Sequence, residues 1–138
     1  GKAQGTLTGG CLCLMADSIG TPYEIDTRDA IVFIEDVDEA PYRLDAMINH
    51  LKLAGKWDAC RGIAFGEDTR WEQHVKEGES SLTPDEILDD YFKPLGKPAF
   101  AGFPFGHIKD PLTLPYGVLA ELDAERGVVS VLESATVR

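Results

Sequence analysis

Three short apolar segments constrain the fold of this chain most, because each lacks the polar alternation of a half-exposed strand. They are AIVFIED (30–36), CRGIAFG (60–66) and KPAFAGFPFGH (97–107). Runs of this length, rich in β-branched and aromatic residues, are typical of strands covered on both faces. Helix-like stretches separate them, and this alternation predicts an α/β fold built on a mainly parallel sheet.

The segments around these strands predict three main helices. The stretch 40–55 carries Leu44, Met47, Ile48 and Leu51 at helical spacing and ends at Gly55. The stretch 82–92 begins with helix start signals, a threonine N-cap, a proline at the first helical position and a glutamate three residues after the cap. The opening, 5–23, predicts a glycine-rich loop that enters a short helix ending near residue 20.

The remaining segments predict a C-terminal hairpin and an exposed loop. Two apolar runs within 113–134 flank the turn DAERG (123–127), which predicts an antiparallel β-hairpin and makes the sheet mixed. The stretch 67–81 is polar and aperiodic, as in an exposed loop. With 138 residues, the chain is expected to form a single domain.

Composition excludes several classes of function. The net charge of -11 argues against binding to nucleic acid or to an anionic membrane, since both need clustered Lys and Arg. Three cysteines make no disulfide framework and suggest a reducing, cytoplasmic setting. Cys11 and Cys13 are expected to be small buried thiols, and the three scattered histidines show no metal-ligand spacing. We therefore expect no metal and no other cofactor.

Two predicted strands end in residues that could work together in acid–base chemistry. Glu35 closes the first apolar run and His107 follows the third. In open α/β sheets reactive side chains gather beyond the carboxyl ends of strands, and a carboxylate on one imidazole nitrogen frees the other to accept a proton. Asp36 and Glu39 are rival carboxylates, although strand alternation would point Asp36 away from Glu35. No serine lies in a Gly-x-Ser-x-Gly elbow, so the chain offers a base and an acid without a nucleophile.

Several motifs together resemble one family. GTLTGGCLCLMADSIGTPYE, IVFIEDVDEAPYRLDAMINHLKLAG, GIAFG, PAFAGFPFGH and LTLPYGVLAELDAERGVVSVLE occur in this order. This succession resembles the C-terminal domain of the LD-carboxypeptidases, serine peptidases that include murein tetrapeptide carboxypeptidases and microcin C immunity proteins. The resemblance covers nearly the whole chain except about 67–81. It departs from the family pattern at Cys11, where the resemblance leads us to expect asparagine.

The resemblance implies a swivelling β/β/α-type domain and catalytic residues that come from two domains. Residues 1–138 would be the C-terminal domain of a longer protein, with the nucleophilic serine on an N-terminal domain outside this chain. Glu35 and His107 would complete a Ser-Glu-His triad, with His107 as the general base. The implied reaction removes a terminal D-alanine from a muropeptide tetrapeptide during cell-wall recycling, and the full-length protein would be a homodimer.

Two alternatives remain open at this point. The chain could belong to a peptide-nucleotide immunity peptidase of the microcin C type, with a different substrate for the same triad. It could instead be a non-catalytic α/β module that binds a partner, in which case Glu35 and His107 would be structural. Replacing them with Gln and Ala would then leave function unchanged.

Overall fold

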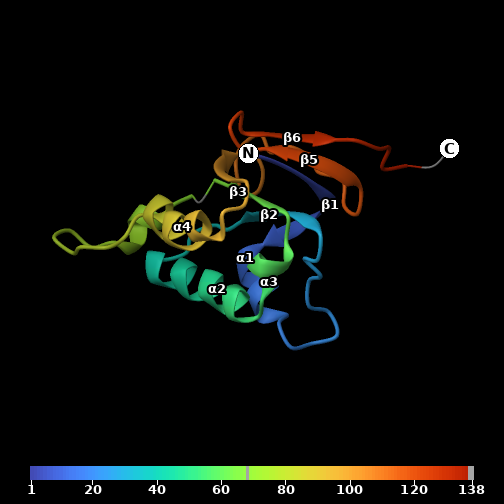
Figure 1. Cartoon of the computed structure of the whole chain (residues 1–138). Helices are drawn as coiled ribbons and strands as arrows, with labels where there is room; N and C mark the ends of the chain where they lie inside the picture. Colours follow the sequence, from blue (N-terminus) through green and yellow to red (C-terminus); the bar gives the residue numbers. More distant parts are fainter. Residues whose placement is uncertain (68, 137–138) are drawn as a thin grey trace.

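The computed structural model describes residues 1–67 and 69–136, which form one six-stranded mixed sheet with helices against it (Figure 1). The strands lie in the order β4-β3-β2-β1-β5-β6. β1 to β4 run parallel, whereas β5 is antiparallel to both β1 and β6. The strands are β1 (Lys2–Cys11), β2 (Ala30–Glu35), β3 (Gly62–Gly66), β4 (Ala99–Phe103), β5 (Leu119–Asp123) and β6 (Val128–Val131).

The β5–β6 hairpin forms one edge of the sheet, at the top of Figure 1, and the helices gather on one side of the sheet. They are α1 (Leu12–Asp17), α2 (Pro41–Leu53), α3 (Lys56–Ala59) and α4 (Pro84–Phe92), with 3-10 turns at Trp71–His74 and Lys93–Leu95. The α/β class, the mixed sheet and the C-terminal hairpin are therefore confirmed. Among the described residues no helix is long and apolar enough to cross a membrane.

Two apolar clusters form the core, one on each face of the sheet. The helix-side cluster contains Ile34 and Val32 of β2 together with Leu12 and the buried residues of α2 and α4. The opposite cluster contains Ile31 and Phe33 of the same strand with buried residues of β1, β3 and β5. Strand β2 is buried along its whole length, as its uninterrupted apolar run predicts.

The predicted loop at the N-terminus is wrong: this segment is the long strand β1, hydrogen-bonded on both sides to β2 and β5. Glycine weakens strands in general, which is why the sequence favours a loop there. Here a neighbouring strand requires the glycine. A Cβ on Gly9 would overlap the backbone oxygen of Phe33 in β2, so only a residue without a side chain allows this close approach. The helix that follows ends at Asp17, three residues before the expected stop.

The third apolar segment was expected to be a buried strand, and that expectation is wrong. β4 is an edge strand, and Ala101 and Gly102 within it are exposed. Only Phe103 at its end is buried in the core. An edge position leaves one side of a strand without a neighbour, so apolar composition alone does not predict burial there.

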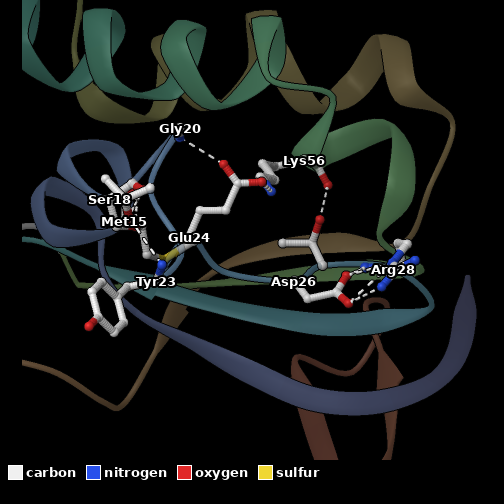
Figure 2. A network of polar contacts seen from close by, with 10 residues as sticks. Met15, Ser18, Gly20, Tyr23, Glu24, Asp26, Arg28 and Lys56 are labelled. Atoms are coloured by element: carbon white, nitrogen blue, oxygen red, sulfur yellow. Dashed lines mark hydrogen bonds and ion pairs between the residues drawn. The ribbon is translucent and has the colours of Figure 1, made fainter.

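Side-chain hydrogen bonds hold the long connection between α1 and β2 (Figure 2). Glu24 accepts from the backbone N–H of Gly20 at 2.7 Å and from Lys56 Nζ at 2.9 Å. Thr27 Oγ1 donates to the Lys56 carbonyl at 2.8 Å. These bonds tie the connection to the start of α3 and fix where β2 begins.

Candidate active site

Glu35 is the last residue of β2, and strand alternation decides which face its side chain occupies. Phe33 belongs to the core cluster away from the helices and Ile34 to the helix-side cluster. Because successive side chains point to opposite faces, Glu35 shares the side of Phe33, and Asp36 shares the helix side with Ile34. The prediction that Asp36 points away from Glu35 agrees with their contacts.

Glu35 and His107 lie in direct contact although 72 residues separate them in the sequence. His107 Nδ1 is 2.6 Å from Glu35 Oε2, and the His107 backbone N–H donates to the same oxygen at 3.2 Å. An ionised carboxylate only accepts hydrogen bonds, so this contact requires the ring proton on Nδ1 and leaves Nε2 as the acceptor. The Glu35 side chain is 5% exposed and the His107 side chain 57% exposed. A buried carboxylate therefore holds an accessible imidazole ring in place.

The residue before His107 allows this contact to form. Gly106 has φ +100, and a Cβ built on it would lie 2.6 Å from both Cγ and Oε2 of Glu35. Glycine satisfies both conditions, the positive φ and the missing side chain. A glycine directly before a candidate catalytic histidine is the sequence signal for this positioning role, although its partner cannot be identified without the fold.

The two rival carboxylates have other partners. Asp36 accepts from the backbone N–H groups of Cys13 at 3.0 Å and Val37 at 2.8 Å. Burial raises the pKa of Asp36 above its ordinary value, and these two hydrogen bonds oppose the rise. Glu39 accepts from Arg43 Nε at 2.6 Å. Glu35 is therefore the carboxylate that the fold brings to His107.

The Cys11–Cys13 pair lies at the neighbouring strand end. Cys11 is the register partner of Glu35 on β1, and its Sγ is 3.2 Å from Cys13 Sγ. Both residues are only partly buried, so the expectation of small buried thiols is wrong for them, whereas Cys60 is buried. Burial, followed by the contact with Cys11 and the charge of Asp36, raises the pKa of Cys13 to about 12. With Asp36 these thiols form the group in the described residues that could hold a metal ion.

The polar segment predicted over 67–81 is largely exposed, as expected, at residue 67 and over 69–81; residue 68 lies outside the described residues. It contacts the backbone next to the site. Thr69 forms a parallel bridge with Val37, and the Asp38 backbone N–H donates to the Thr69 carbonyl at 2.9 Å. His74 Nε2 lies 3.0 Å from Asp38 Oδ1. All these contacts are made to Val37 and Asp38, directly after Asp36 in the chain. They hold the loop beside the Glu35–His107 site.

Comparison with known proteins gives matches over most of the chain. A sequence profile of the LD-carboxypeptidase C-terminal domain matches residues 4–122, most of the chain. The chain belongs to the LD-carboxypeptidase family. The probable murein peptide carboxypeptidase of Bacillus subtilis (strain 168) is 42% identical to this chain over 130 residues, which are 94% of this chain and 40% of the relative.

Solved structures of the family share the fold. Muramoyltetrapeptide carboxypeptidase from Oxalobacter formigenes superposes with a TM-score of 0.82 at 31% identity, over 94% of this chain and 44% of that one. The microcin C7 self-immunity protein MccF has a TM-score of 0.84 at 26% identity, over 99% of this chain and 40% of that one. The chain thus spans about two fifths of the length of these proteins.

Proposed function

We propose that this chain supplies the glutamate and histidine of a serine LD-carboxypeptidase, with Glu35 orienting His107 as the general base. The observation that carries the proposal is the 2.6 Å contact between a buried carboxylate and Nδ1 of an exposed imidazole. In this arrangement Nε2 takes the proton of an attacking hydroxyl, and the carboxylate stabilises the imidazolium that forms. His107 then returns the proton to the leaving amine.

The nucleophile of this reaction would be a serine on another domain of the same protein. In residues 1–67 and 69–136, no serine hydroxyl hydrogen-bonds to His107; the bonded ones serve local backbone groups instead. The chain matches about 40% of the length of its relatives, which leaves room for a further domain in them. On this proposal residues 1–138 form the C-terminal domain and have no hydrolytic activity alone.

The substrate proposed is a murein tetrapeptide, from which the enzyme would release the terminal D-alanine. The relative named as a murein peptide carboxypeptidase is 42% identical, whereas MccF is 28% identical over 135 residues. This difference favours a muropeptide over the second candidate, a peptide-nucleotide of the microcin C type. The three free cysteines of the described residues suit a reducing cytoplasm, where we place the protein. That the full-length protein is a homodimer is proposed from the family resemblance alone.

The test uses the full-length protein that contains this chain and measures D-alanine released from a purified tetrapeptide. We expect H107A and E35Q each to lower kcat by about 10⁴-fold or more, as loss of a triad member does elsewhere. H50A is the matched control, because His50 is an exposed histidine on α2. Equal activity of all three variants would make Glu35 and His107 structural and leave the non-catalytic module as the reading. Cleavage of a peptidyl-nucleotide in place of the tetrapeptide would select the immunity peptidase.

A further inference from the structure

A second cluster of reactive side chains lies where β1 meets α1. Cys11 is the last residue of β1, and Cys13 is the second residue of α1. Their sulfur atoms are 3.2 Å apart, and Cys11 Sγ is 4.0 Å from Asp36 Oδ1. One ligand atom from each of the three residues lies within 4.8 Å of the other two. The fold thus brings two thiols and a buried carboxylate from two parallel strand ends to one place.

In the described residues this cluster shares no hydrogen bond with the Glu35–His107 pair, although Cys11 is the register partner of Glu35. Asp36 lies on the helix side of the sheet, opposite Glu35, and shares no hydrogen bond with His107. Its two oxygens each accept one backbone N–H, from Cys13 and from Val37. A carboxylate oxygen has two lone pairs, so each oxygen can still bind a cation while it keeps its hydrogen bond.

The separations suit a small tetrahedral ion. With metal–sulfur bonds of about 2.3 Å and a metal–oxygen bond of about 2.1 Å, tetrahedral angles place two sulfurs about 3.8 Å apart and a sulfur and an oxygen about 3.6 Å apart. The distances of 3.2 Å and 4.0 Å lie on either side of these values. Side-chain shifts of about half an ångström would therefore bring both distances to tetrahedral values.

We propose that Cys11, Cys13 and Asp36 bind one thiophilic divalent cation, such as Zn²⁺ or Cd²⁺, with a fourth position open to water. Thiolate ligands select such ions over Mg²⁺ and Ca²⁺, which prefer oxygen ligands. Cys11 and Cys13 are both partly exposed, so an ion and its water have access. Both thiols give up their protons to solvent as the metal–sulfur bonds form, and no oxidant or reductant is needed.

Local charge supports the same assignment. Asp36 and Glu39 both act electrostatically on Cys13, and the charge of Glu39 is paired with Arg43 at 2.6 Å. Two thiolates and a carboxylate carry three negative charges, which a divalent ion largely neutralises. A cation bound by Cys11, Cys13 and Asp36 would therefore offset the negative charge of these groups.

The test is a Co²⁺ titration of the reduced chain, followed by displacement with Zn²⁺. We expect one equivalent to give the intense visible bands of tetrahedral cobalt and a sulfur-to-cobalt charge-transfer band, both of which Zn²⁺ abolishes. C11S and C13S should each weaken cobalt binding by more than about 10-fold, because even substitutions outside the ligand set lower metal affinity by about 10-fold or more. C11S/C13S should show no charge-transfer band. D36N should keep that band but bind more weakly.

C60S is the matched control, because Cys60 is a buried thiol that donates to the Trp57 carbonyl outside the cluster. It should bind cobalt as the unchanged chain does. An octahedral cobalt spectrum, or a charge-transfer band that survives in C11S/C13S, would overturn the proposal. The readout is optical and needs no substrate, so its outcome is independent of the carboxypeptidase proposal.

Discussion

Replacing Gly106 with alanine tests whether close packing behind His107 creates the Glu35–His107 contact. The added Cβ would lie 2.6 Å from Cγ and Oε2 of Glu35, whereas carbon atoms normally approach to about 3.5–4 Å. Glu35 would have to retreat by about 1 Å, which stretches the 2.6 Å contact with Nδ1 beyond hydrogen-bonding range. We therefore expect G106A to break the pair without changing either of its members.

The expected loss of stability in G106A has two parts, and a control variant separates them. An alanine at φ +100 carries backbone strain of about 1–3 kcal/mol, and the lost hydrogen bond to a charged group adds about 1.5–3 kcal/mol. G102A is the matched control: Gly102 has φ +79, and a Cβ there meets nothing within 4 Å. G102A should show the strain alone, so G106A should unfold at a temperature about 5–12 °C lower than G102A.

The assay combines calorimetry with NMR of the histidine ring. The proton on Nδ1 of His107, held by a buried carboxylate, should resonate far downfield in the unchanged chain and in G102A. In G106A this resonance should disappear through exchange with water. If G106A melts with G102A and keeps the resonance, then Glu35 accommodates a side chain at 106, and the argument from close packing fails.

Four further predictions concern individual side-chain contacts. Thr83→Ala removes the capping box of α4 and should cost about 1 kcal/mol, or about 4 °C in Tm by calorimetry; an unchanged Tm would contradict it. Tyr91→Phe removes the 2.6 Å hydrogen bond to Asp45 and should lower the free energy of unfolding in urea by about 1.5 kcal/mol. Burial and then Asp45 raise the pKa of Tyr91 to about 12, so its phenolate absorbance should appear only near that pH and not around pH 10. Lys2 holds the pKa of Asp123 below its ordinary value, so this group stabilises the fold above about pH 4 and loses that effect as pH falls further; D123N should therefore flatten the acid limb of a Tm–pH curve.

Much of the architecture was predictable because local patterns and tertiary contacts agree in most elements. The apolar run of β2 is buried throughout, and the stripe Leu44, Met47, Ile48 and Leu51 of α2 forms part of the helix-side core. The start signals of α4 form the complete capping box with its N-terminal proline. In these elements the structure that the local sequence pattern favours is also the one that the tertiary contacts require.

Local patterns failed where a neighbouring strand decides the outcome. β1 reads as a loop because it is rich in glycine, yet a glycine there allows β2 to approach closely. β4 reads as buried because it is apolar, yet it lies at the edge of the sheet. Both facts depend on strand order, which a single sequence does not state.

The same division holds for the site. From the sequence alone, Glu35 and His107 could be selected as strand-end residues able to act together, and family resemblance could suggest their roles. Strand alternation also predicted that Asp36 points away from Glu35. Only the tertiary structure decided that Nδ1 of His107 reaches Glu35, and that Cys11 and Cys13 stay partly exposed next to Asp36. The reason is physical: parallel strands joined by helices bring together residues far apart along the chain, and distances of a few ångströms between them depend on register and packing, which no local pattern encodes.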